Sequence, residues 1–267
     1  MESSKSSTSP ILKWDPARII SHDHGFEGYA LLTLNQPLDN LDLLKSLWER
    51  AGYRIAADGG GNRLHKVYHG DSTFANLIKK IPLEVIHGDL DSLHQTTRSW
   101  ALAHSTEVVL DPSQESTDFT KCVSYISKHY LPKCNSAPDV VVLGGIGGRV
   151  DQGLSILHHL YKSPQIYPQG RIYLVSTSAI TFLLTAGTHQ ITVKNPQATV
   201  LGKNIGILPV GVPAKITTSG LRWDVADWET SFGGQMSTSN MVREAEVTIT
   251  TDADVLFTID LDMDEEE

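Results

Sequence analysis

The 267-residue sequence contains only two cysteines, Cys122 and Cys134. Two cysteines are too few for the disulfide framework of a small secreted protein, and they exclude a Cys-rich zinc site. We therefore expect both thiols to be reduced and the protein to be cytoplasmic.

Long apolar runs and an excess of basic residues are also absent. No segment approaches the roughly 20 residues of a membrane span, and Met1–Lys5 does not begin the apolar core of a signal peptide. The 22 Lys and Arg residues stand against 31 Asp and Glu, for a net charge of −9. A general nucleic-acid binder is disfavoured, because no broad basic surface can displace counterions from phosphates. We expect neither a membrane nor a nucleic acid as a partner.

The first part of the chain is predicted to form an α/β domain. Residues 1–28 are interpreted as an N-terminal extension that is partly disordered, since its first ten residues are rich in Ser and Thr. Between residues 29 and 178, strand-like apolar runs alternate with segments of helical spacing, which indicates a Rossmann-like parallel sheet with helices on both faces. The predicted strands are Tyr29–Leu34, Tyr53–Ala57, Val85–Ile86, Glu107–Leu110, Val140–Leu143 and Arg171–Val175.

Residues 179–267 follow a different pattern. Helical spacing disappears, and short β-type runs recur with turn residues between them, so we predict a separate β-sandwich domain. The expected strands are Ile180–Leu184, Gln190–Val193, Ile205–Leu208, Lys215–Thr218, Ala245–Thr250 and Leu256–Ile259. The acidic tail, residues 260–267, is expected to be solvated.

Two carboxylates, Asp89 and Asp91, follow the apolar run that ends at Gly88. If the chain stays extended, residues two apart point to the same side. Carboxylates that close repel each other unless a cation lies between them, and oxygen ligands suit Mg²⁺ better than Zn²⁺. The alternative is that Asp89 caps the next helix and Asp91 is solvated.

Two more polar loops follow predicted strands. The three glycines within Asp58–Arg63 permit close backbone approach and leave amides able to bind an anion. Asp118 falls in the first turn of a helix capped by Ser116 or Thr117. Taken alone, the loop Asp58–Arg63 is also consistent with a plain strand-to-helix turn. Asp118 alone is also consistent with a carboxylate that stabilises its helix through the helix dipole.

A glycine-rich loop with Arg149 follows the strand Val140–Leu143. Glycines before a helix form an anion cradle, and Arg149 adds a bidentate phosphate donor. A nicotinamide site is disfavoured, because Val150 replaces the third glycine of that fingerprint and no ribose-binding acid follows about 20 residues on. Ligands bind at the carboxyl ends of parallel strands, so the common position of these loops predicts one site.

Two loops in the second domain are chemically unusual, Thr218–Trp223 and Ser237–Asn240. Trp223 follows Arg222, and a Trp most often fills a core. The alternative is an indole ring that stacks on an aromatic or cationic substrate.

Taken together, the loops resemble those of the thiamin pyrophosphokinase family, most closely its eukaryotic, fungal-type members. Six separate motifs occur in one order, which makes the resemblance specific over about Tyr29 to Ile259. The motifs are Asp58–Leu64, Gly88–Ser92, Gln114–Lys121, Gly144–Gln152, Ser219–Trp223 and Ser237–Asn240.

The resemblance implies an α/β domain joined to a β-sandwich, a homodimer with its active site at the subunit interface, and Mg²⁺-dependent transfer of pyrophosphate from ATP to the hydroxyl of thiamin, which releases AMP. The resemblance assigns metal binding and catalysis to Asp89, Asp91 and Asp118, and a further catalytic role to Asp151. It assigns ATP and phosphate binding to Asp58, Gly59, Asn62, Gln114, Arg149 and Gln152. It assigns thiamin binding to Trp223, Ser239 and Asn240.

Some parts of the chain depart from the family pattern or leave alternatives open. Glu115 stands where the family often has Asp, and residues 225–235 have no assigned role. A non-catalytic sensor that binds nucleotide or thiamin is the main rival to an enzyme, because cradles and a Trp pocket also serve binding. A third possibility is that the second domain is a separate interaction module.

Overall fold

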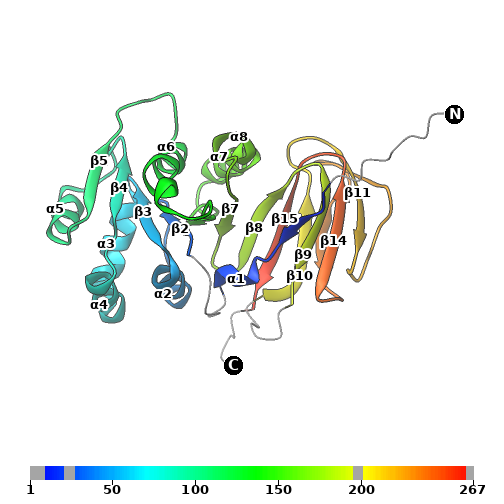
Figure 1. The fold of residues 1–267 in the computed structure, drawn as a ribbon, viewed down its shortest axis with the longest axis horizontal. Coiled ribbons are helices and arrows are strands. Elements are labelled where there is room, and N and C mark those ends of the chain that lie inside the picture. Colours follow the sequence, from blue (N-terminus) through cyan, green and yellow to red (C-terminus); the bar gives the residue numbers. More distant parts are fainter. Residues whose placement is uncertain (1–9, 21–27, 195–200, 263–267) are drawn as a thin grey trace. The chain divides into compact units, whose positions relative to one another are not determined.

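A computed structural model describes residues 10–20, 28–194 and 201–262 of the chain (Figure 1). The chain divides into two compact units. His24–Phe182 form one, called here the α/β unit, and Met1–Asp23 with Leu183–Glu267 form the other, called the β unit. The division falls between residues 182 and 183, whereas the predicted boundary lies after residue 178.

The α/β unit is built on a sheet whose strands run in the order β5, β4, β3, β2, β6, β7, β8. Neighbours from β5 to β7 pair in parallel, and β8 joins antiparallel to β7. The strands are β2 (Ala30–Thr33), β3 (Tyr53–Ala57), β4 (Val85–Gly88), β5 (Glu107–Leu110), β6 (Val140–Leu143), β7 (Ile172–Val175) and β8 (Ala179–Leu184). The predicted alternation of strands and helices is confirmed. Successive strands from β2 to β5 are added on one side of β2, whereas β6 and β7 are added on the other side.

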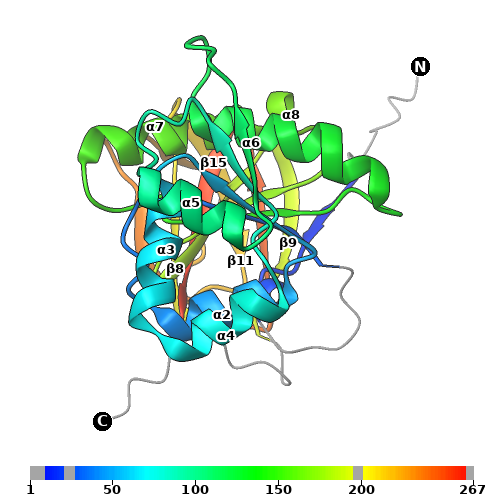
Figure 2. The ribbon, with the colours of Figure 1, turned by 90° about the vertical axis from the view of Figure 1, so that its left-hand side faces the viewer.

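Helices lie on both sides of this unit, with α2 and α4 on one side and α6, α7 and α8 on the opposite side (Figure 2). The helices are α2 (Leu41–Arg50), α3 (Gly60–Gly70), α4 (Ser72–Lys80), α5 (Gln95–Ala103), α6 (Asp118–Tyr125), α7 (Val150–Tyr161) and α8 (Ser163–Ile166). A π-helical turn (Ile126–Tyr130) and a 3₁₀ turn (Leu131–Lys133) continue α6. All residues of β2, β4, β6 and β7 are buried, as expected for parallel strands between helices.

Side-chain caps explain where several helices begin. Asn40 accepts a hydrogen bond from the amide of Leu43, and Asp71 accepts one from the amide of Phe74. Thr117, rather than Ser116, caps α6. Each cap satisfies an amide that has no partner within its own helix.

The β unit contains two sets of paired strands. In one sheet the order is β1, β9, β14, β11, β12, and in the other set β10 pairs with β13 and β15. The elements are β1 (Leu12–Trp14), α1 (Ala17–Ile20), β9 (Gly187–Thr192), β10 (Leu201–Leu208), β11 (Ala214–Ser219), β12 (Trp228–Thr230), β13 (Ser237–Met241), β14 (Glu246–Thr251) and β15 (Val255–Leu261). Burial alternates along β11, so one face of its sheet forms the core. The predicted change to all-β structure is confirmed.

The N-terminal extension contains structure that the sequence analysis did not find. Leu12–Trp14 form β1, which pairs in parallel with β9. The indole nitrogen of Trp14 lies 3.0 Å from Nδ1 of the buried His189. A three-residue strand is too short to show periodicity, which explains the omission. The disorder predicted for the first ten residues falls on residues 1–9, outside the described part of the chain, apart from Pro10.

Three further differences from the sequence analysis lie in the β unit. Ser237–Met241, expected to include a loop, form strand β13, which pairs with β10 and lacks the apolar alternation that would have revealed it. Trp228–Thr230, within the unassigned residues 225–235, form β12. Asp260, expected in a solvated tail, belongs to β15 and accepts hydrogen bonds from the amide and side chain of Asn204. Residues 263–267 lie outside the described part.

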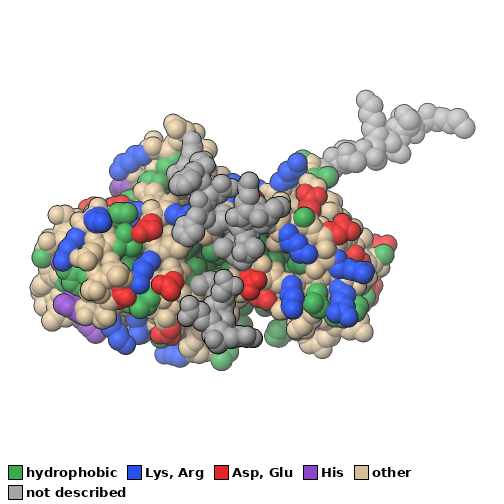
Figure 3. Space-filling model, turned by 90° about the horizontal axis from the view of Figure 1, so that it is seen from below, with side chains coloured by type: hydrophobic (Ala, Val, Ile, Leu, Met, Phe, Trp, Pro, Cys, Tyr) green, Lys and Arg blue, Asp and Glu red, His purple; other side chains and the backbone are tan. Residues whose placement is uncertain are grey.

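No helix in the described residues is long and apolar enough to cross a membrane. Acidic and basic side chains both occur across the face shown in Figure 3.

Candidate functional site

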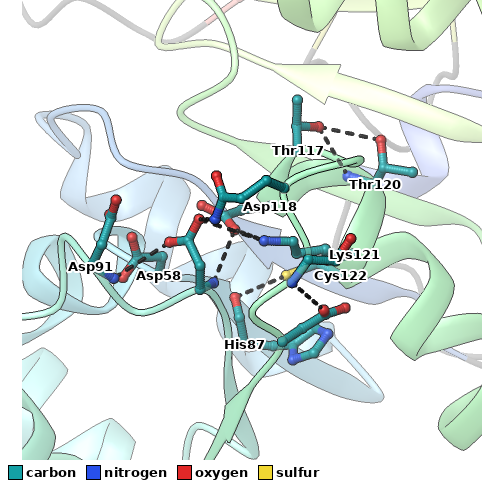
Figure 4. A network of polar contacts seen from close by, with 12 residues as sticks. Asp58, His87, Asp91, Thr117, Asp118, Thr120, Lys121 and Cys122 are labelled. Atoms are coloured by element: carbon teal, nitrogen blue, oxygen red, sulfur yellow. Dashed lines mark hydrogen bonds and ion pairs between the residues drawn. The ribbon is translucent and has the colours of Figure 1, made fainter.

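Three carboxylates meet at one edge of the sheet in the α/β unit (Figure 4). Asp58 follows β3, Asp89 follows β4 and Asp118 opens α6. One oxygen from each lies within 4.8 Å of the others. The strands β3 and β4 are parallel neighbours, so their carboxyl ends bring Asp58 and Asp89 together. We call these three residues the acidic cluster.

Backbone conformation decides which carboxylates join the cluster. Gly88 has φ +152°, and a Cβ added there would lie 2.7 Å from Oδ1 of Asp118, so this position requires glycine. Leu90 has φ +61°, and the chain therefore does not continue as a strand. The condition for that prediction, an extended chain from Asp89 to Asp91, is therefore not met. Asp91 is exposed and accepts a hydrogen bond from the Ser92 hydroxyl.

Asp58, which was predicted to bind phosphate, belongs to the acidic cluster, and Asp91 does not. Its side chain is buried, and Oδ2 accepts a hydrogen bond of 3.1 Å from the amide of Ser92. Oδ1 is buried without a hydrogen-bond partner among the described residues. Burial, with the nearby charges of Asp118, Asp91 and Asp89, raises the pKa of Asp58 to about 6, although the Ser92 amide opposes this shift. A buried, unsatisfied carboxylate oxygen is suited to bind a cation.

Lys121 supplies a buried positive charge to the cluster. Its ammonium lies 3.3 Å from Oδ1 of Asp118 and 3.6 Å from Oδ2 of Asp89. Burial lowers the pKa of Lys121, but the charge and hydrogen bond of Asp118 and the charge of Asp89 outweigh burial and raise it. Lys121 was not among the predicted site residues. The signal was its spacing of three residues from Asp118, which places both on one face of α6.

Gln114 also contacts the cluster, as its Nε2 lies 3.3 Å from Oδ2 of Asp89. Burial raises the pKa of Asp89, but the Asp91 amide, Gln114 and Lys121 together lower it. Three carboxylates and one ammonium leave a net charge of −2, by −3 + 1. The oxygen donors, their separation and the unsatisfied oxygen of Asp58 fit a hard divalent cation.

The loop Asp58–Arg63 is held by packing as well as by its glycines. A Cβ on Gly59 would collide with the side chain of Asn35, and a Cβ on Gly60 would collide with the carbonyl of Thr33. The side chain of Asn62 donates to the carbonyl of Ser92 at 2.8 Å and accepts from the amide of His94 at 3.0 Å. Asn62 therefore positions the loop that carries Asp89 and Asp91.

Arg149, Asp151 and Gln152 lie at the start of α7. Arg149 forms an ion pair with Asp151 at 2.6 Å, and both side chains are exposed. The hydrogen bond from Arg149 lowers the pKa of Asp151. The structure does not place Asp151 in the acidic cluster.

The loop before α7 borders a cavity of about 220 Å³ between the ends of β2 and β6, where the direction of chain progression reverses. Ligands bind at such positions in open α/β sheets. Its lining comes from three segments, Gln36–Leu44, Leu143–Gly148 and Val175–Thr177.

In the β unit, Asn240 is buried and organises the loop that carries Trp223. Its side chain accepts hydrogen bonds from the amides of Trp223 and Met241 and donates to the carbonyl of Trp223. Trp223 is 54% exposed, which excludes a role as core filler. The Arg222 guanidinium lies 4.8 Å from the ring centre, so the ring already binds a cation on one face. Ser239 is exposed with φ +56°.

Both units are similar to known proteins. Residues 44–174 match the family model "Thiamin pyrophosphokinase, catalytic domain", and residues 188–256 match "Thiamin pyrophosphokinase, vitamin B1 binding domain". The chain is 36% identical to thiamine pyrophosphokinase 1 of Arabidopsis thaliana over 239 residues, covering 87% of the chain and 86% of that protein. It is 30% identical to thiamine pyrophosphokinase of Saccharomyces cerevisiae over 288 residues, covering 91% and 88%.

Solved structures show the same likeness. The crystal structure of yeast thiamin pyrophosphokinase superposes with a TM-score of 0.83 at 26% identity, covering 98% of this chain and 94% of that one. Thiamin pyrophosphokinase from Candida albicans superposes with a TM-score of 0.78 at 25% identity, covering 95% of each chain. The likeness extends to plant and fungal proteins alike, so it does not single out the fungal type. The two family models fall in different units of the chain.

Proposed function

The chain belongs to the thiamin pyrophosphokinase family, and from that premise we propose that its acidic cluster holds the divalent metal ion needed for the reaction. The protein is an enzyme that transfers the pyrophosphoryl group of ATP to the hydroxyl of thiamin, giving thiamin diphosphate and AMP. The buried, unsatisfied Oδ1 of Asp58, next to Asp89 and Asp118, is the observation that carries the proposal.

Mg²⁺ is the ion that we assign to the cluster. All three candidate ligands are carboxylates, and such ligands favour Mg²⁺ over Zn²⁺. When bound, the ion neutralises charge on the phosphates of ATP. Asp91 remains a proposed ligand through water, because its carboxylate is exposed beside the cluster.

The other polar residues bind phosphate in this proposal. In the reaction, the thiamin hydroxyl oxygen forms a bond to the β-phosphorus, and the bond from that phosphorus to the α–β bridging oxygen breaks, releasing AMP. The hydroxyl proton passes to solvent. Lys121 and Gln114 lie at the cluster and can donate to phosphate oxygens. Arg149 and Gln152, with the backbone at Gly59, are proposed to hold the rest of the triphosphate, and Asn62 supports them through the Ser92 loop.

Asp151 is proposed to orient the thiamin hydroxyl. The hydrogen bond from Arg149 lowers its pKa, which makes the carboxylate a weak base. Phosphoryl transfer through a loose transition state depends more on positioning than on early proton removal. The ion pair therefore favours orientation over deprotonation.

The β unit is proposed to bind thiamin through Trp223, Ser239 and Asn240. In a homodimer, these residues are proposed to complete the active site of the partner subunit. The exposed indole offers a face for the cationic thiazolium ring. We class the α/β unit as Rossmann-like, from its strand order, and the β unit as a sandwich of two sheets. The domain limits, residues 29–178 and 179–267, and the cytoplasmic location stay predictions.

The experiment for the activity measures AMP from ATP by the full-length protein. With MgCl₂ and thiamin, we expect AMP and thiamin diphosphate in equal amounts, and with EDTA neither. A reaction without thiamin is the control, since AMP formed there would indicate hydrolysis. Binding of both substrates without AMP formation would instead support a sensor, which the intact acidic cluster disfavours.

Subunit mixing tests the shared site. Asp89→Asn in one subunit and Trp223→Ala in the other leave one intact site in each heterodimer, so random mixing should restore about a quarter of wild-type activity at low thiamin concentration. If each subunit used its own Trp223, mixing would restore nothing.

A further inference from the structure

Two histidines on α3 point their ring nitrogens at one another. His65 and His69 are four residues apart and therefore lie on the same helix face. Their Nε2 atoms are 3.0 Å apart, and their ring centres are 4.7 Å apart. His65 is half-buried and His69 is exposed, so ions in solvent can reach the pair.

The two ring nitrogens lie at hydrogen-bonding distance, and the same separation lets both bind one ion. Two imidazoles bound at 90° to an ion, as in square-planar or tetragonal coordination, with a metal–nitrogen distance of about 2.1 Å, place their nitrogens about 3.0 Å apart and their ring centres about 4.6 Å apart. A linear N–H···N bond of the same length would place the ring centres about 5.3 Å apart. The observed 3.0 Å and 4.7 Å agree with the first geometry.

His65 is also oriented by its neighbours on α5. Its Nδ1 lies 3.0 Å from the hydroxyl of the buried Thr97, and its ring stacks on Trp100 with centres 4.9 Å apart and planes 21° apart. When Nδ1 donates to Thr97, Nε2 keeps its lone pair for a metal. Such a contact behind a histidine ligand fixes both the tautomer and the ring position.

We propose that His65 and His69 form a bidentate site for one divalent transition-metal ion of the Ni²⁺ and Cu²⁺ class. Imidazole nitrogens suit these ions and not Mg²⁺, so this site and the acidic cluster select different metals. Among the described residues, the acidic cluster is the only group of three or more potential ligands that meets, so water completes the coordination here. The pair borders an open cavity of about 640 Å³ that is also lined by Asp91 and His94.

The test is calorimetric titration of NiCl₂ into the full-length protein. Excess MgCl₂ keeps Ni²⁺ from the carboxylates of the acidic cluster. We expect each wild-type chain to bind one Ni²⁺ ion tightly. His69→Ala should weaken binding at least about tenfold, because two-point attachment becomes one-point. The matched control is Lys66→Ala, an exposed residue on the same helix between the two histidines, which should retain wild-type affinity.

Tryptophan fluorescence provides a second reading. Ni²⁺ at His65 should quench Trp100, and Trp100→Phe should lose that quenching while calorimetry still detects the ion. Because His69 is exposed, its replacement should leave the melting temperature without Ni²⁺ unchanged. The proposal is overturned if the wild type binds no Ni²⁺ in excess MgCl₂, or if His69→Ala binds it as tightly as the wild type.

Discussion

The substitution Lys121→Met separates the electrostatic role of this lysine from its packing. Methionine keeps the apolar stem of the side chain and removes the ammonium. The lysine side chain is only 1% exposed, and its charge lies 3.3 Å from Asp118 and 3.6 Å from Asp89. Without the ammonium, Asp89 and Asp118 lose the positive charge that their ion pairs place beside them. We expect the variant to be destabilised in the absence of divalent metal.

The size of this effect follows from the exposure of the partners. Breaking a buried ion pair by removing one charge costs about 3–5 kcal/mol. The side chains of Asp89 and Asp118 are 19% and 31% exposed, so water screens part of the repulsion, and we expect about 2–3 kcal/mol. Removing the ammonium also removes its repulsion of Mg²⁺, so the ion should bind the variant more tightly than the wild type. Because tighter binding stabilises the folded variant more, saturating Mg²⁺ should recover part of the loss.

The assay is thermal unfolding of the full-length protein in EDTA and in excess MgCl₂. In EDTA the melting temperature of Lys121→Met should fall by about 4–12 °C, and in MgCl₂ by less. Lys128→Met changes an exposed lysine in the same helical segment and should melt like the wild type in both conditions. A loss of equal size with and without MgCl₂ would show that Lys121 acts through packing and would refute the reasoning. An unchanged melting temperature in EDTA would do the same.

Three other predictions test the site and the fold. Asp58→Asn should reduce AMP formation about 100-fold or more. The loss should be at least as large as in Asp91→Asn, because Asp58 belongs to the acidic cluster and Asp91 does not. A clearly larger loss in Asp91→Asn would contradict that grouping. Trp223→Ala should raise the KM for thiamin roughly 5- to 30-fold with little change in kcat, and Trp223→Phe much less; an unchanged KM in the alanine variant would rule out stacking. Hydrogen bonds from the Thr73 hydroxyl and the Phe74 amide lower the pKa of Asp71 to about 2, so its stabilising effect is complete above pH 4 and disappears as the pH falls through 2. Melting of Asp71→Ala against the wild type over that range should show the difference shrink; a constant difference would mean that the carboxylate charge is irrelevant.

Much of the architecture was predictable because it depends on local periodicity. Fully apolar runs such as Val140–Leu143 identify buried parallel strands, and Asn40 marks the start of α2. Elements with weak patterns were missed. β1 has three residues, and β13 carries mostly polar residues, so only their partners β9 and β10 define them as strands.

The site was predictable as a set of loops and not as a set of contacts. Asp58, Asp89 and Asp118 all follow strand ends or open a helix, which a sequence reveals. Which of the nearby carboxylates meet depends on the backbone, which leaves the extended conformation at the positive φ of Leu90, between Asp89 and Asp91. Lys121 was missed because a lysine on a helix is normally solvated, and burial cannot be read from one position.

The sequence by itself determined the fold class, the family and the position of the polar loops, because strand and helix periods and motif order are properties of the chain alone. Only the tertiary structure decided the composition of the acidic cluster, the burial of Lys121 and the exposure of Trp223. These depend on how β3, β4 and α6 pack, and so on distances between residues far apart in the sequence. The contact of His65 with Thr97 on α5 is of the same kind: spacing places two histidines on one helix face, but packing alone orients the ring.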